Sequence, residues 1–201
     1  MTWIKTVPFD EAEGKLRRLY ERVSGPGNNV DNIMIAHSLR PHSMEGHMAL
    51  YKNVLHHSGN TLPKWFLEAL GVFVSALNRC PYCVDHHFEG MKRLLNDADR
   101  SESIRLALLE GDFGQAFSET ETLAFIYARH LTLAPFFVAE TSIDGLRNAG
   151  YADGEILEIN QVVAYFNYAN RTVLGLGVIT EGDEIGLSPG DSDDPSNWNH
   201  G

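Results

Sequence analysis

The sequence predicts an all-α protein, and three kinds of observation support this fold class. Apolar side chains recur at helical spacing, for example between residues 44 and 55. Helix start and stop signals are present, such as Ser118 followed by Glu121 three residues later, and Gly150 at the end of a helical stretch. No stretch shows a convincing alternation of apolar and polar residues, which would be typical of a β-strand.

In the N-terminal half, residues 1–8 are expected to be extended, and Asp10 is a candidate cap for the first helix. Gly-Pro-Gly and Asn-Asn predict a loop at residues 24–29. Pro41 ends the second helix, and Ser-Gly-Asn at residues 58–60 ends the third. The predicted helices of this half are residues 9–23, 33–39, 41–57, 62–77 and 81–95.

In the C-terminal half, the capping pattern at Ser118 and the glycine stop at Gly150 delimit helices. The tail from Glu181 is acidic and rich in Gly, Ser, Asp and Pro, so we expect it to be irregular or disordered unless Trp198 holds it against a surface. The predicted helices of this half are residues 101–110, 118–131, 139–149 and 153–174.

Composition narrows the function classes. The chain has 201 residues, 43% of them hydrophobic, as expected for a globular protein of one domain or two small halves. Its formal net charge of −11 disfavours nucleic-acid binding, which needs a basic face. No run is long enough for a transmembrane helix, and residues 1–23 lack an apolar signal core. We therefore expect a cytoplasmic protein with no membrane partner.

Both cysteines lie in the stretch Cys-Pro-Tyr-Cys-Val-Asp-His-His, residues 80–87. Pro81 suits the first position of a helix, which would place Cys80 at the cap and Cys83 in the first turn. Unpaired backbone N–H groups and the helix dipole there favour a thiolate at both sulfurs. His87 follows Cys83 by four residues and so shares its helical face, whereas the neighbouring His86 is expected to point elsewhere. This arrangement predicts side-chain redox chemistry without a cofactor, including an intramolecular disulfide under mild oxidant.

The spacing Glu68-x11-Cys80-x2-Cys83-x3-His87 resembles the active-site motif of the alkylhydroperoxidase D-like (AhpD-like) proteins of the carboxymuconolactone decarboxylase superfamily. Further fragments resemble its longer, peroxidase-related branch. They are Glu-Ala-Glu-Gly-Lys-Leu-Arg from residue 11, His-Ser-Leu-Arg-Pro from residue 37, Asn-Arg-Cys-Pro-Tyr-Cys from residue 78 and Asn-Tyr-Ala-Asn-Arg from residue 167. The likeness covers roughly residues 9–180.

The resemblance implies an AhpD-like helical fold and a thiol-dependent peroxidase that reduces hydroperoxides. It assigns Cys83 as the peroxide-attacking thiol, Cys80 as the proton donor that then closes the disulfide, and Glu68 with His87 as a proton relay. Well-known members carry a further histidine immediately before the second cysteine, where this chain has Tyr82. A dithiol protein, lipoyl or thioredoxin-like, would be the reductant, and a trimer-based homo-oligomer is expected.

We place a single helical domain at residues 1–180 and an acidic tail at 181–201. Within the domain, the spacing from Glu68 to Cys80 recurs from Glu158 to Asn170. This weak repeat suggests two related helical units, a thiol-bearing one at about residues 40–100 and a second at about 115–180.

The sequence offers four alternatives, of which the first lacks a ligand. Structural zinc needs four ligands, and the thiol pair with one histidine supplies three, so no metal site is expected. A glutaredoxin- or thioredoxin-like disulfide oxidoreductase would use Cys80 as the nucleophile, but the helical segments on both sides of the motif argue against that fold. A carboxymuconolactone decarboxylase-type lyase would not need the cysteine pair. A non-catalytic oligomer that senses redox state through the disulfide is the fourth.

Overall fold

The computed structural model describes residues 2–190, 192–194 and 196–200. The described part of the chain is helical and has no β-strand, only isolated β-bridges that pair His57 with Ser192 and Pro189 with His200. The all-α prediction is therefore confirmed. The α-helices are α1 (Gly14–Val23), α2 (Asn32–Ala36), α3 (Pro41–Leu55), α4 (Lys64–Leu77), α5 (Pro81–Leu95), α6 (Ala98–Glu110), α7 (Glu119–Leu133), α8 (Glu140–Asn148) and α9 (Asp153–Leu176).

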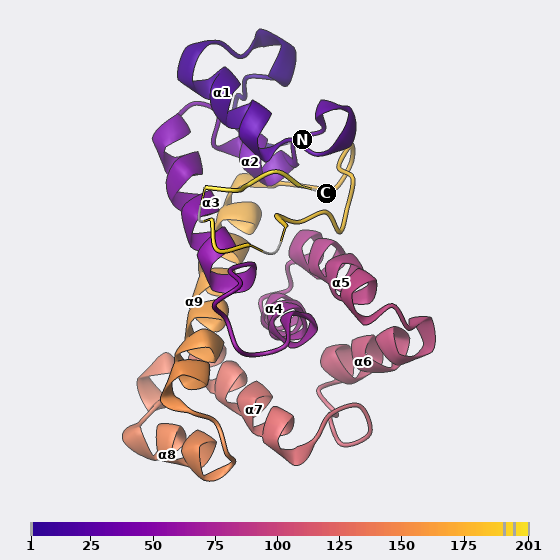
Figure 1. Cartoon of the computed structure of the whole chain (residues 1–201), viewed down its shortest axis with the longest axis vertical. Coiled ribbons are helices and arrows are strands. Elements are labelled where there is room, and N and C mark those ends of the chain that lie inside the picture. The colour runs from indigo at the N-terminus through magenta and orange to yellow at the C-terminus, as the bar shows by residue number, and fades with distance from the viewer. Residues whose placement is uncertain (1, 191, 195, 201) are drawn as a thin grey trace.

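Helix α4 forms the centre of the molecule. It contacts α3, α5, α6, α7 and α9, and Figure 1 shows it nearly end-on, with the other helices around it. Residues 66–75 of α4 are all buried, and apart from Glu68 and Ser75 this segment is apolar on every side, as expected of a central helix. Helices α4 and α5 are joined by a tight turn, so the start of α5 with its thiols lies beside the central helix.

A glycine allows α4 and the long helix α9 to approach closely. A Cβ atom at Gly71 would lie 2.2 Å from the ring of Phe166. The ring of Phe166 in turn packs edge-on against His87, with 4.5 Å between the ring centroids. This contact fixes the depth at which α9 sits behind the functional residues of α4 and α5.

Most predicted helices are present, with shifts at their ends. The first begins at Gly14, because residues 9–11 form a separate turn of 3-10 helix. Helix α6 begins before the predicted start, since the Asp97 side chain accepts a hydrogen bond from the Arg100 backbone N–H at 3.0 Å and caps it. The capping box at Ser118 and Glu121 is confirmed, with both reciprocal hydrogen bonds present.

The chain after α9 is irregular, as predicted, but it is packed against the domain. We call the described residues from Val178 to His200 the C-terminal segment. Figure 1 shows it running back across the side of the molecule where α2 and α3 lie. Trp198 is buried, and the Arg22 guanidinium lies 3.8 Å from the centroid of its ring. The sequence predicted an ordered tail only if Trp198 held it against a surface, and Trp198 makes this contact.

No helix in the described residues is long and apolar enough to cross a membrane. Because α4 contacts helices of both predicted units, the structure places no visible boundary between them. The division into two related units stays a prediction.

Candidate active site

The two thiols sit at the start of α5, as the proline signal predicted. Cys80 is the N-cap residue, Pro81 occupies the first turn, and Cys83 follows within that turn. Before them Arg79 adopts a left-handed backbone with φ of 55°, a conformation that costs a non-glycine residue about 1 kcal/mol. This residue ends α4 and redirects the chain so that α5 starts against it. Both cysteines are free thiols and buried, but only Cys83 borders the cavity described below.

The two sulfurs differ in acidity because they share a hydrogen bond. The bond from Cys83 lowers the pKa of the Cys80 thiol below its ordinary value. The same bond, together with burial, raises the pKa of Cys83 well above its ordinary value. A hydrogen bond from Asn170 of α9 acts in the lowering direction on both. The expectation that the helix N-terminus favours a thiolate at both positions is therefore wrong for Cys83, since burial and the shared proton outweigh the helix dipole.

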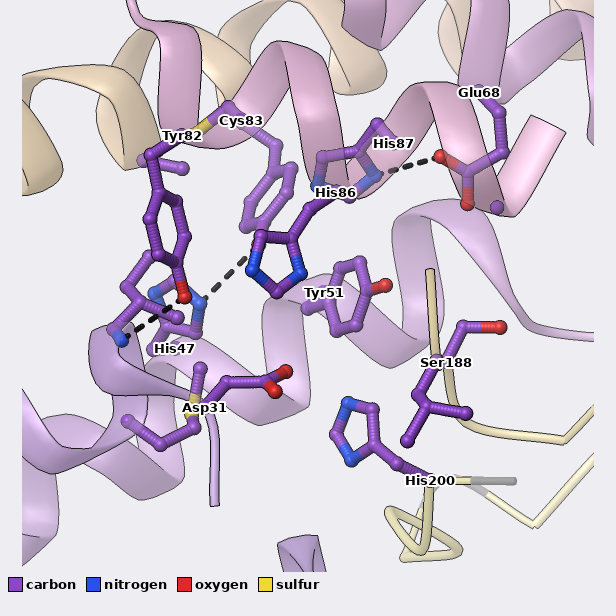
Figure 2. Close-up of a pocket in the computed structure, with 16 residues that line it drawn as sticks. Asp31, His47, Tyr51, Glu68, Tyr82, Cys83, His86, His87, Ser188 and His200 are labelled. Atoms are coloured by element: carbon purple, nitrogen blue, oxygen red, sulfur yellow. Dashed lines mark hydrogen bonds and ion pairs between the residues drawn. The ribbon is translucent and has the colours of Figure 1, made fainter. Parts of the chain in front are cut away.

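Glu68 and His87 meet as the motif predicted. The Glu68 carboxylate of α4 is buried and lies 2.7 Å from Nδ1 of His87 on α5 (Figure 2). When Nδ1–H donates to a carboxylate, Nε2 becomes the nitrogen that accepts protons. The other Glu68 oxygen lies 3.5 Å from Nε2 of His56, whose pKa burial lowers well below its usual range. Glu68 therefore stands between two imidazoles, one of which is held neutral.

A second polar cluster lies at the same cavity and was not foreseen. Asp183 of the C-terminal segment accepts a hydrogen bond from the Tyr82 hydroxyl at 2.7 Å, and His86 Nε2 lies 3.2 Å from the same oxygen. The backbone N–H of Asn32 also donates to this carboxylate at 3.0 Å. The rings of Tyr82 and His86 stack with 4.5 Å between centroids. The expectation that His86 points away is wrong, because the tail brings a carboxylate that holds the ring at the cavity.

Cys83, Glu68, His87, Tyr82 and His86 border one polar cavity between α2, α3, α4, α5, α9 and the C-terminal segment (Figure 2). The space open to water-sized molecules is about 40 Å³. Its titratable imidazoles and carboxyl groups are Asp31, His47, Glu68, His86, His87 and His200.

Burial shifts several of the cavity groups toward their neutral forms. It lowers the pKa of His47 to about 3 and that of His200 to about 4. Burial also raises the pKa of Asp31 to about 7, with Asp183 and Glu184 adding to the effect. Around neutral pH these two histidines are therefore uncharged, and Asp31 is near the midpoint of its titration.

The cavity thus brings together three of the four predicted site residues, Cys83, Glu68 and His87, with Cys80 hydrogen-bonded behind Cys83. Among the described residues, no group of three or more His, Cys, Asp or Glu side chains is placed to hold a metal ion. Sequence reasoning missed Asp31, Asp183, His200 and Asn170. The neighbourhoods of Asp31, Asp183 and His200 carry no motif. Asn170 lies in the fragment of residues 167–171, but the sequence assigns it no role, and only the fold brings these residues to the site.

No protein-family model and no curated protein sequence matches the chain. Several solved structures, however, have a similar fold. An uncharacterized peroxidase-related protein with an alkylhydroperoxidase AhpD core, from Ralstonia eutropha JMP134, superposes with a TM-score of 0.75 at 20% identity, over 92% of this chain and 96% of that one. An uncharacterized peroxidase-related protein from Silicibacter sp. TM1040 gives a TM-score of 0.70 at 22% identity, over 91% and 92% of the two chains.

A third similar structure is the debrominase Bmp8, in which a cysteine-to-alanine variant binds 2,3,4-tribromopyrrole. It gives a TM-score of 0.66 at 16% identity over 89% of each chain. The glutaredoxin-like fold is excluded, because the thiols stand on a helical scaffold with no strand in the described residues. The fold that the sequence resemblance predicted is confirmed, and the chain has the AhpD-like helical fold.

Proposed function

We propose that this protein is a thiol-dependent peroxidase that reduces hydroperoxides through a sulfenic acid and disulfide cycle at Cys83 and Cys80. The main support for this proposal is one observation. The buried Cys83 borders a polar cavity, a second thiol is hydrogen-bonded behind it, and the Glu68–His87 pair lines the same cavity. These are a nucleophile, a resolving thiol and a base, the three parts that peroxide reduction by thiols requires.

The first step is the attack. Because the pKa of Cys83 is raised, its proton must leave as the sulfur attacks, and His87 one helical turn along is the base that accepts it. Glu68, bonded to the opposite ring nitrogen, stabilises the imidazolium that forms. The sulfur bonds to one peroxide oxygen, the O–O bond breaks, and the departing alkoxide or hydroxide takes the proton of Cys80.

The second step closes the disulfide. The Cys80 thiolate attacks the Cys83 sulfenic acid and expels hydroxide, which takes the proton back from His87 and leaves as water. Both thiols have then lost a proton, the peroxide has become an alcohol and water, and two electrons have moved from sulfur to oxygen. A dithiol protein, lipoyl or thioredoxin-like, returns the electrons by exchange through a mixed disulfide.

Three features favour this chemistry over the other candidates. The lowered pKa of Cys80 makes it a ready proton donor and then a ready attacking thiolate. A non-catalytic sensor would make no use of the Glu68–His87 pair, and a lyase would make no use of the two hydrogen-bonded thiols. The cavity, with about 40 Å³ open to water-sized molecules, suits a hydroperoxide better than a halogenated ring such as the tribromopyrrole bound by the debrominase.

The test is peroxide consumption by the reduced protein with dithiothreitol as the electron donor. We expect turnover in the wild type and none in Cys83→Ser. Glu68→Gln and His87→Ala should slow the reaction by about 10²-fold, the usual size of a lost acid–base step. His42→Ala, which removes an exposed imidazole, is the matched control and should retain full activity. Absence of consumption by the wild type, with both thiols verified as reduced, would overturn the proposal.

A further inference from the structure

The C-terminal segment supplies one wall of the thiol cavity. Leu187, Ser188 and His200 line it, and in Figure 2 Ser188 and His200 lie across the cavity from Glu68 and the thiol-bearing helix. Leu187 and His200 are themselves buried, at 8% and 5% exposure. The tail is therefore part of the site, although the motif that carries the chemistry ends more than 90 residues earlier.

Separate contacts hold this wall at both ends. At its start, Asp183 is bonded to Tyr82, to His86 and to the backbone N–H of Asn32. At its end, His200 Nδ1 lies 2.7 Å from the carbonyl oxygen of Val23. These contacts tie the segment to α5 and to the N-terminal helices, so that its position over the cavity is fixed.

Between these ends, the buried Lys52 ammonium of α3 donates to the carbonyl of Gly190 and to Ser192 Oγ. A charge this deeply buried is stable only while its acceptors stay in place. Release of the segment would remove these acceptors, and Lys52 therefore adds to the force that keeps the wall closed.

One residue of the segment is fitted closely against the thiol-bearing helix. Gly186 has φ of 80°, and a Cβ atom there would lie 2.7 Å from Cβ of Glu89 and 3.0 Å from its carbonyl carbon. Only glycine lets the chain pass α5 at this distance. Leu187 comes next, so the depth at which Gly186 packs sets how far the wall projects into the cavity.

The closed wall leaves little room in front of Cys83. About 10–15 Å³ is enough to admit one water, so a cavity of about 40 Å³ has room only for a small molecule beside Cys83. Hydrogen peroxide, with two oxygen atoms, fits such a space. We expect a hydroperoxide on a tertiary or aromatic carbon to need more space than this and to enter only if the wall moves.

We propose that the C-terminal segment determines the substrate class of the thiol site, restricting it to hydrogen peroxide and excluding bulky organic hydroperoxides. The inference rests on the proposed peroxidase function and adds its substrate. The residues that carry the selectivity are Leu187, which lines the cavity, and Gly186, which sets how closely this wall packs against α5.

The experiment compares kcat/KM for hydrogen peroxide and for cumene hydroperoxide in the full-length protein. Gly186→Ala should lift the wall and raise the relative rate with cumene hydroperoxide by at least about tenfold. Gly182→Ala is the matched control, since Gly182 has φ of 94° in the same segment but nothing within 4 Å of an added Cβ. It should leave the ratio within about twofold of wild type. Leu187→Ala, which strains no backbone, should also raise the relative rate with cumene hydroperoxide. It provides the test if Gly186→Ala folds poorly.

The outcomes separate the two proposals. A wild type that prefers hydrogen peroxide, with the preference reduced in Gly186→Ala or Leu187→Ala, supports the inference. A wild type that reduces both peroxides equally well, or a ratio unchanged in folded Gly186→Ala and Leu187→Ala, overturns it while the peroxidase function stands. A wild type that consumes neither peroxide overturns both.

Discussion

Replacing His200 with glutamine should change how stability depends on pH. Burial lowers the pKa of His200 from 6.5 to about 4 in the folded protein. A histidine with a lowered pKa keeps the folded state stable above pH 6.5, and the stability is lost as the pH falls toward 4. At pH 5 the unfolded chain binds this proton about 30-fold more favourably than the folded one, which corresponds to about 2 kcal/mol.

The wild-type curve alone does not isolate this effect. The pKa of Asp31 is raised from 3.8 to about 7, so its contribution runs the other way. Stability from the Asp31 proton is present below pH 3.8 and is lost as the pH rises through 7, which offsets His200 between pH 7 and 5. The measurement is therefore a difference: urea unfolding of wild type and His200→Gln at pH 7 and at pH 5.

We subtract the free energy of unfolding of wild type from that of His200→Gln. This difference should be about 2 kcal/mol higher at pH 5 than at pH 7, which means that the variant gains relative stability at low pH. His42→Gln, at an exposed position, should show no such change. A His200→Gln curve that runs parallel to the wild-type curve would show that His200 is not buried in a neutral form, and would refute the packed position of the tail.

Two further predictions concern packing and assembly. Gly71→Ala should lower the free energy of unfolding by about 3 kcal/mol, because the new Cβ would overlap the Phe166 ring, whereas Gly175→Ala in the open part of α9 should raise it by about 0.5–1 kcal/mol. Equal effects in urea unfolding would contradict this account of the α4–α9 contact. The protein should sediment as a homo-oligomer at micromolar concentration, since Leu133, Phe136 and Phe137 expose apolar surface at the end of α7, and a clean monomer would refute this.

The sequence predicted the parts of the site that act locally along the chain. Pro81 placed the helix start and both thiols, and the four-residue spacing placed His87 on the face of Cys83. The pairing of Glu68 with His87 came from the family motif alone, since no local rule brings a residue of one helix to another. The helix pattern succeeded wherever amphipathic periodicity and caps agreed, as at Ser118 and Glu121.

The sequence did not predict which residues the C-terminal segment contributes to the site. An acidic segment rich in Gly, Ser, Asp and Pro is typical of solvated chain, and nothing local marks Asp183 as the partner of Tyr82. The acidity of the thiols was also mispredicted for Cys83, because the helix dipole is a local effect while burial depends on the whole fold. His86 was misjudged for the same reason, since the carboxylate that holds it comes from residue 183.

The central claim is that Cys83 attacks the peroxide and Cys80 resolves, and dimedone labelling tests it most directly. Each single Cys→Ser variant is reduced, treated with one equivalent of hydrogen peroxide and labelled, and the modified residue is found by mass spectrometry. Without Cys80, the sulfenic acid at Cys83 has no thiol to condense with and should be trapped. Cys83→Ser should take no label, because only Cys83 borders the cavity. Label on Cys80 in the Cys83→Ser protein, with none on Cys83 in the other, would contradict the account and reverse the two roles.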